Sequence, residues 1–226
     1  MSRRLLTLQV AGMFAVIALC LFAAAGTWQW PAAWAFLILF FIFVLALVRW
    51  LLRHNPSLLL ERMTGTGKSD QKTWDLVFTI LLNIYFLAWL VAMPLDAVRF
   101  GWSHMSPVLQ AMGGVGLLSA FYLFFLTFRE NAYLSPAVRI QHDRGQRVVS
   151  TGPYRLVRHP MYAAGALYLL GTALLLGSWV GVAGGVVIDL GLAWRAVQEE
   201  RTLGHELPGY AAYLSQVRWR LVPYLW

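Results

Sequence analysis

Residues 31–52 read PAAWAFLILFFIFVLALVRWLL and carry a single charged side chain, that of Arg49. A run of about 20 apolar residues is long enough to cross the hydrocarbon layer of a bilayer as a helix. Three more runs, at 5–25, 74–95 and 107–128, are similar in length and character. The whole chain is 59% hydrophobic and only 12% charged, which lies outside the balance of a soluble domain. The sequence therefore predicts a multi-spanning membrane protein.

Two shorter apolar pieces follow, at 161–176 and 179–194, and Gly177 and Ser178 join them. Hydrocarbon offers no partners to backbone polar groups, so we expect these pieces to form a tight helical hairpin. The predicted fold is all-α, with about six transmembrane helices of which the last two form this hairpin. We interpret 1–226 as a single integral membrane domain, with four spans in 1–128 and the hairpin with most polar motifs in 129–226.

The basic residues are distributed very unevenly over this topology. On the six-span arrangement, 17 of the 18 lysines and arginines fall on one side, and only Arg99 falls on the other. By the positive-inside rule, the N-terminus, the C-terminus and the two long loops face the cytosol. Topology thus explains the net charge of +8 without a nucleic-acid partner.

Several residues within the spans call for packing or polar contacts. Small residues let helices approach closely, which is the role we expect for two glycine groups: Gly113, Gly114 and Gly116, and Gly181, Gly184 and Gly185. Asp189 is an acid inside an apolar run, so we expect it either to pair with a neighbouring helix or to line a cavity. The segment 61–72, with Thr64 to Gly67, is expected to be a flexible loop without a chemical role.

Polar residues are concentrated on both sides of the predicted hairpin. They occupy 129–131, 138–147 and 150–162 before it, and Arg195, Glu199, Glu200, Arg201, His205 and Glu206 after it. A hairpin returns the chain to the side from which it came, so both clusters are expected at one membrane face. Arg195 and Glu199 are four residues apart and share a helix face. They form either a surface ion pair or a common ligand site, while Glu200 points elsewhere and could pair with a loop arginine.

His159 and Pro160 stand where the loop enters the hairpin. Proline at an early helical position fixes the start of a helix without removing an intrahelical hydrogen bond. His159 could cap that helix or belong to a site. No second histidine has a ligand spacing to it, and Cys20 is the only cysteine, so we expect no metal site.

The motifs at these positions together resemble a known enzyme family. The motifs are Gly152-Pro153-Tyr154-Arg155, Arg158-His159-Pro160-Met161-Tyr162, Glu199-Glu200, and Gly209-Tyr210 with Tyr213. In combination they are similar to the isoprenylcysteine carboxyl methyltransferase family and the related phospholipid methyltransferases. The preceding 129–131 and 138–141 resemble its bacterial branch. The resemblance covers about 129–223 well and 61–100 more loosely.

This resemblance implies an S-adenosylmethionine site at the cytosolic face. The cofactor-binding residues that it implies are Gln141, Gln146, Arg147, Val148, Val149, Tyr154, His159, Pro160, Met161, Tyr162 and Glu199. Glu199 would meet the amino-acid part of the cofactor, and Arg195 would face the acceptor substrate. Arg195 and Glu199 are accordingly the expected catalytic residues, and the expected partners are a lipophilic or lipidated substrate and membrane lipids.

The residue types suit methyl transfer. Such a reaction requires donor, methyl carbon and acceptor to be held in line, and orientation alone supplies several kcal/mol of the barrier. A carboxylate acceptor, such as that of a prenylated cysteine, is already ionised and needs no strong base. Methylation of a phospholipid amine or a small thiol is the alternative within enzymes. A non-catalytic transporter or scaffold whose basic loops bind anionic headgroups is the alternative outside them.

Overall fold

The computed structural model describes residues 3–64, 67–68 and 70–226. Eight α-helices form within them, together with a π-helical turn at Leu95–Arg99 and short 3-10 turns at His142–Arg144 and Gly152–Arg155. The helices are α1 (Arg3–Ala25), α2 (Pro31–His54), α3 (Pro56–Met63), α4 (Thr73–Pro94), α5 (Pro107–Glu130), α6 (Pro160–Leu176), α7 (Trp179–Glu206) and α8 (Tyr210–Gln216). The described residues contain no sheet, which confirms the all-α prediction.

All six predicted apolar runs are helical. Five of these helices, α1, α2, α4, α5 and α7, are long and apolar enough to cross a membrane. Helix α6 is apolar but has 17 residues, or about 25 Å at 1.5 Å per residue. The hairpin is present, because α6 ends in the left-handed Gly177 and Ser178 caps α7 by accepting a hydrogen bond from the Gly181 N–H. Helix α7 continues to Glu206, twelve residues beyond the predicted apolar run.

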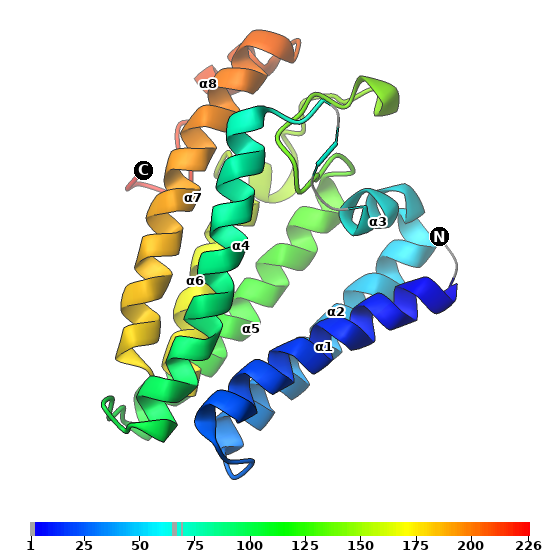
Figure 1. Ribbon diagram of the computed structural model, residues 1–226. Coiled ribbons are helices and arrows are strands. Elements are labelled where there is room, and N and C mark those ends of the chain that lie inside the picture. Colours follow the sequence, from blue (N-terminus) through cyan, green and yellow to red (C-terminus); the bar gives the residue numbers. More distant parts are fainter. Residues whose placement is uncertain (1–2, 65–66, 69) are drawn as a thin grey trace.

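The elements separate into two ends of the bundle (Figure 1). Both termini, α3, α8 and the loop between α5 and α6 lie at one end, which we call the polar end. The connections from α1 to α2, from α4 to α5 and from α6 to α7 lie at the other. The basic segments that we expected on one side therefore gather at one end. Arg99 is at the opposite end, where its guanidinium packs against Gly26.

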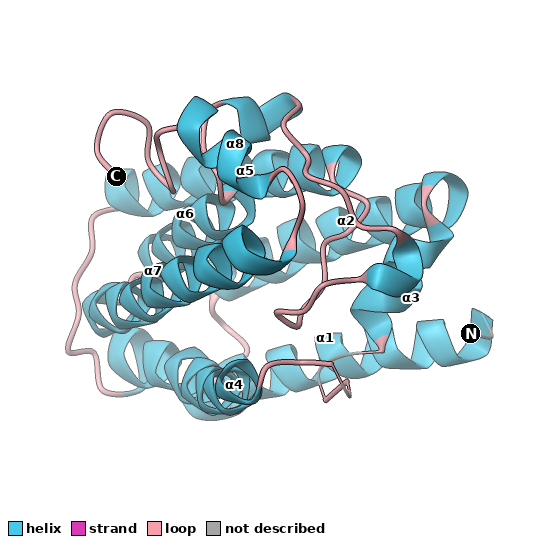
Figure 2. Ribbon diagram, turned by 90° about the horizontal axis from the view of Figure 1, so that it is seen from above, coloured by secondary structure: helices cyan, strands magenta, loops and turns pink. Residues whose placement is uncertain are grey.

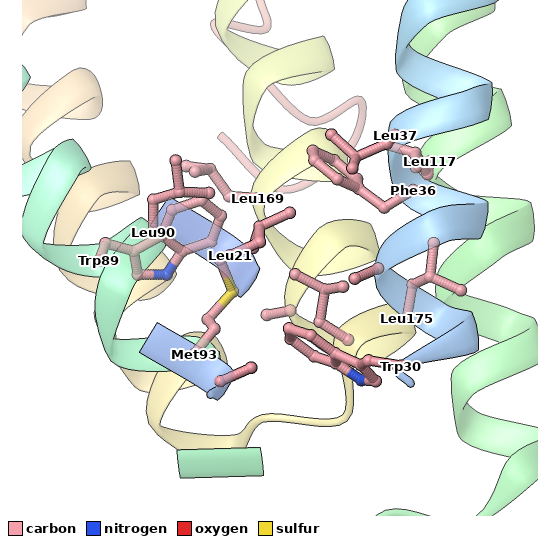
Figure 3. Close-up of a cluster of buried hydrophobic side chains, with 14 of the residues drawn as sticks. Leu21, Trp30, Phe36, Leu37, Trp89, Leu90, Met93, Leu117, Leu169 and Leu175 are labelled. Carbon is pink, nitrogen blue, oxygen red and sulfur yellow. The ribbon is translucent and has the colours of Figure 1, made fainter. Parts of the chain in front are cut away.

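The main hydrophobic core lies away from the polar end (Figure 3). Leu21 of α1, Phe36 of α2, Trp89 and Met93 of α4, and Leu169 of α6 are all buried in it. The Trp89 indole N–H donates to the carbonyl of Gly181 at 2.7 Å and ties α4 to α7. From this core, α1 and α2 diverge from α4 toward the polar end (Figures 1 and 2). The space between these helices at the polar end is occupied by α3 and the loop between α5 and α6 (Figure 1).

Close helix packing confirms the role of part of the glycine set. A Cβ on Gly171 of α6 would stand 2.6 Å from the backbone nitrogen of Leu117 on α5, and a Cβ on Gly113 would clash with the α6 backbone at Leu175. Gly181 likewise leaves room for Met93. By contrast, a Cβ on Gly114 would make only ordinary contact, at 3.8 Å from Leu175. Helices α5 and α6 therefore pack backbone to backbone.

Candidate active site

A cavity of about 370 Å³ opens at the polar end. Its walls come from the loop between α5 and α6, the first turns of α6, the polar half of α7, and parts of α3, α4 and α8. Of the predicted site residues, all except Pro160 line it: Gln141, Gln146, Arg147, Val148, Val149, Tyr154, His159, Met161, Tyr162, Arg195 and Glu199. Pro160 occupies the first position of α6 and sets where that helix begins.

Arg195 and Glu199 are linked through a tyrosine. The Tyr162 hydroxyl donates to Glu199 Oε2 at 2.6 Å and accepts from Arg195 Nη1 at 3.1 Å. The two α7 residues share a face as their spacing predicted, yet their charges meet across Tyr162 of α6. The three groups therefore form one polar surface on the cavity wall.

A carboxylate from α4 neutralises Arg195. Arg195 Nε donates to Asp75 Oδ1 at 2.8 Å, and its Nη2 donates to the Pro136 carbonyl at 2.8 Å. Asp75 is fully buried and also accepts from the backbone N–H of Val138 at 2.8 Å. This arrangement joins α4, α7 and the 135–139 loop. Sequence reasoning missed Asp75, since it begins an apolar run and its partner is 120 residues away.

Glu200 anchors the loop that enters α6. It lies 3.2 Å from Arg158 Nε and 3.2 Å from His159 Nε2, and it accepts from Arg220 Nε at 3.0 Å. The expected pairing of Glu200 with a loop arginine is thus confirmed. The His159 ring stacks on Tyr162, with ring centroids 5.4 Å apart, so Glu200 also fixes one wall of the cavity.

The C-terminal segment closes over the same loop. The backbone N–H groups of Arg158 and His159 donate to the carbonyls of Trp219 and Arg220, both at 2.9 Å. The Tyr213 hydroxyl donates to the Tyr154 carbonyl at 2.8 Å. Tyr154 in turn accepts a hydrogen bond at its hydroxyl from Asn131, and burial raises the pKa of its phenol. The loop is held rigidly from both sides.

The stretch 147–149 lines the cavity with backbone groups that no described residue pairs. Gln141 and Gln146 brace each other, since the Gln141 backbone N–H donates to Gln146 Oε1 at 2.8 Å. Arg147, Val148 and Val149 follow, and their backbone N–H and C=O groups make no hydrogen bond with another described residue. Backbone polar groups are ordinarily paired, so this edge is suited to a polar ligand.

Helix α3, which we did not predict, brings two charges to the site. Glu61 is buried and accepts hydrogen bonds from Lys68, Ser135 and Arg139. Burial opposes its ionisation, but these three partners outweigh burial and lower the pKa of Glu61 to about 2. Arg62 lines the cavity, although no chemical role was expected in 61–72. The flexibility expected there involves Gly65, Thr66 and Ser69, which lie outside the described residues.

Other residues with functional potential do not reach the cavity. Asp189 is half-buried on α7 and is not part of the lining, and one of its carboxylate oxygens has no described partner. His205 is exposed near the end of α7. Tyr133 and Tyr210 do line the cavity and were not among the predicted site residues. Over the described part of the chain, no three His, Cys, Asp or Glu side chains are grouped to hold a metal ion.

One continuous segment of the chain, 139–206, supplies all the predicted site residues that line the cavity. Residues 139–206 match the family model for phospholipid methyltransferases. The matched segment holds every predicted site residue as well as α6 and α7, and it spans 68 of the 226 residues. No curated protein matches the chain. The similarity indicates a methyltransferase embedded in a membrane.

The cavity has the donor set that a sulfonium cofactor requires. Its volume is within the range of small-ligand pockets. Glu199 supplies a carboxylate, the 147–149 backbone supplies free polar groups, and Tyr154, Tyr162 and Tyr210 supply aromatic walls. An amino acid joined to a nucleoside needs these three kinds of surface. The residues present therefore fit S-adenosylmethionine.

Proposed function

We propose that the protein is an S-adenosylmethionine-dependent methyltransferase of the membrane, with a lipophilic acceptor that is most directly the carboxylate of an isoprenylcysteine-like substrate. The observation that carries the proposal is the meeting of the predicted site residues around one cavity inside the family-matched segment. In the membrane we place the polar end in the cytosol, because basic residues accumulate on cytosolic segments.

The residues divide naturally between cofactor and acceptor. Glu199 binds the ammonium of the amino-acid part, and the backbone of 147–149 with Gln146 binds polar groups of the nucleoside. Tyr154, His159, Met161 and Tyr162 provide the packing surface. S-Adenosylmethionine, when bound, supplies a methyl group activated by its positively charged sulfur. Arg195 faces the remaining space, where the acceptor enters.

Positioning accounts for the chemistry. The acceptor oxygen forms a bond to the methyl carbon while the carbon–sulfur electron pair stays on sulfur, so a carboxylate loses no proton. Asp75, the Pro136 carbonyl and Tyr162 use three of the five N–H groups of Arg195 and fix its plane. The remaining N–H groups can aim a carboxylate by charge-assisted hydrogen bonds.

The family match favours a second candidate acceptor, the amine of a phospholipid headgroup. An amine must lose a proton before or during methyl transfer. Glu200 is committed to Arg158, His159 and Arg220, and Asp189 does not line the cavity. Glu199 with the Tyr162 hydroxyl is then the group placed to take that proton.

Access from the bilayer supports a lipophilic acceptor of either kind. The cavity lining includes Leu82 and Asn83, which lie about two helical turns beyond Asp75 on α4. That distance is about 10 Å along the helix axis, toward the membrane layer. Asn83 is exposed, so this arm of the cavity opens on the side of the bundle. An acceptor with an acyl or prenyl chain can enter there without leaving the bilayer.

The cofactor site can be tested by titration calorimetry of S-adenosylmethionine into the purified protein in detergent. We expect wild-type protein to bind, and Glu199→Ala and His159→Ala to lose most of the affinity. His205→Ala and Glu206→Ala, exposed positions on the same helix, serve as matched controls and should bind normally. Wild-type affinity in both site variants, or no binding by wild-type protein, would overturn the proposal.

The acceptor class is then identified with labelled donor and native membrane extract. Label in a base-labile ester indicates a carboxylate acceptor, and label in the phospholipid fraction indicates an amine. Transfer to neither a lipid nor a lipidated molecule would contradict the proposed substrate class.

A further inference from the structure

The charges around the cavity do not balance. Five arginines and one acid line it: Arg62, Arg139, Arg147, Arg158, Arg195 and Glu199. Arg139 pairs with Glu61, Asp70 and Asp143, Arg158 pairs with Glu200, and Arg195 pairs with Asp75. Arg147 is exposed to solvent, which screens its charge. Arg62 is the remaining arginine.

Arg62 is half-buried and has no acceptor for its guanidinium among the described residues. The ring of Phe128 lies beside it, with its centroid 5.4 Å from Arg62 Cζ. Its neighbour Glu61 faces away to Arg139, Lys68 and Ser135. Burial and the positive charge of Arg195 both lower the pKa of Arg62, although an arginine stays charged at neutral pH. This cation is thus held in the cavity at an energetic cost.

The surroundings of Arg62 suit the head of a lipid. Phe128, Leu58 and Leu59 belong to a buried apolar cluster beside it, and Met161 both packs on that cluster and lines the cavity. The opposite wall reaches Leu82 and Asn83 on α4. The guanidinium therefore stands between an apolar surface and the polar surface of Tyr162 and Glu199. A ligand with an oxyanion next to a hydrocarbon chain matches this layout.

We infer that Arg62 binds the oxyanion of the lipophilic acceptor, either a carboxylate or a phosphodiester, and so selects oxyanion-bearing lipids for the site. The inference rests on the proposed function for the reaction, but binding itself can be measured without turnover. Arg195 differs from Arg62 because its charge is already neutralised by Asp75 and its plane is fixed by three hydrogen bonds. Arg62 donates no hydrogen bond to a described residue, so its donors remain for the ligand.

The test is equilibrium binding of four probes to the full chain in detergent. An S-farnesylcysteine with a free carboxylate is compared with its carboxamide, and a phosphatidylethanolamine is compared with a diacylglycerol. We expect wild-type protein to prefer the oxyanion-bearing member of at least one pair, the free carboxylate or the phosphodiester, by about 10- to 100-fold, the strength of a charge-assisted hydrogen bond. The pair that shows the preference identifies the carboxylate or the phosphate as the ligand.

Arg62→Gln should abolish the preference, and Arg62→Lys should keep part of it because the charge remains. Arg53→Gln is the matched control, since Arg53 is exposed at the end of α2 on the same polar end and does not line the cavity. Arg62→Gln should also melt close to the wild-type temperature, because the buried cation that it removes makes no hydrogen bond with a described residue and is held only by the ring of Phe128 and the nearby charge of Glu61. A preference that persists in Arg62→Gln, or no preference in wild-type protein, overturns the inference.

The two proposals can fail separately. If wild-type protein binds no S-adenosylmethionine but shows an Arg62-dependent preference for an oxyanion-bearing lipid, the methyltransferase function fails and the oxyanion site stands. If it binds the cofactor and the preference is independent of Arg62, the function stands and this inference fails.

Discussion

Arg195 of α7 and Asp75 of α4 form an ion pair of 2.8 Å between Nε and Oδ1, with Asp75 fully buried. The pair joins the two helices that carry opposite walls of the cavity. It also holds the 135–139 loop, because Pro136 and Val138 bond to its two members.

Replacing Asp75 with Asn should destabilise the protein strongly. The size of the side chain is kept, but Arg195 loses its directly bonded counterion and keeps only the charge of Glu199 across Tyr162, so breaking this buried pair should cost up to about 3–5 kcal/mol. Unfolding in sodium dodecyl sulfate, followed by tryptophan fluorescence, measures this. Asp70→Asn removes a partially exposed partner of Arg139 and should cost at most about 1 kcal/mol. Equal losses in the two variants would show that the Asp75 pair is not the stronger constraint.

Arg195→Lys separates charge from shape. Lysine keeps a positive charge beside Asp75 but lacks the planar fork that reaches Asp75, Tyr162 and Pro136 together. We expect cofactor affinity to change by a few-fold and the single-turnover rate of methyl transfer to fall about tenfold or more, equivalent to at least about 1.4 kcal/mol. The control is Arg201→Lys, an exposed arginine whose side chain bonds Gln198. An unchanged rate in Arg195→Lys would show that Arg195 does not position the acceptor and contributes only a positive charge at this end of the bundle.

The lowered pKa of Glu61 predicts that the stability of the folded protein depends on pH in the acid range. Its pKa falls from 4.5 to about 2 on folding, so its ionised form stabilises the protein above about pH 4.5, and this contribution is lost as the pH falls toward 2. The shift corresponds to a stabilisation on the order of 3 kcal/mol. The melting temperatures of wild-type protein and Glu61→Gln should therefore differ at pH 6 and converge as the pH falls below 4. A constant difference over this range would contradict the assignment.

The sequence predicted the parts of the fold that depend on local patterns. Apolar runs located six helices, and Gly177 and Ser178 located the hairpin turn. Helix α7 extends beyond its predicted run because the polar residues 195–206 continue the helix outside the apolar layer. Helix α3 was missed, since its eight residues are too few for a helical pattern to be distinguished from a loop.

The site divides in the same way into residues that local motifs predicted and residues that only tertiary contacts bring together. The predicted residues that line the cavity lie on two short stretches, 141–162 and 195–199, and each stretch carries a recognisable local motif. Asp75 and Arg62 belong to α4 and α3, and nothing near them in the chain indicates that they meet Arg195 or the cavity. Their role depends on tertiary contacts alone, as do the backbone bonds of Trp219 and Arg220 to the loop before α6.

Under the proposed function, the reach of the cavity to Leu82 and Asn83 determines which concentration of acceptor governs turnover. An acceptor delivered through that side would arrive by diffusion in two dimensions, so its effective concentration would be its mole fraction in the bilayer and not its amount per litre. Dilution of the acceptor with inert lipid would then slow encounter even when the total acceptor is constant. The membrane would be the second solvent of the reaction, whereas a water-soluble methyl donor would be supplied in three dimensions.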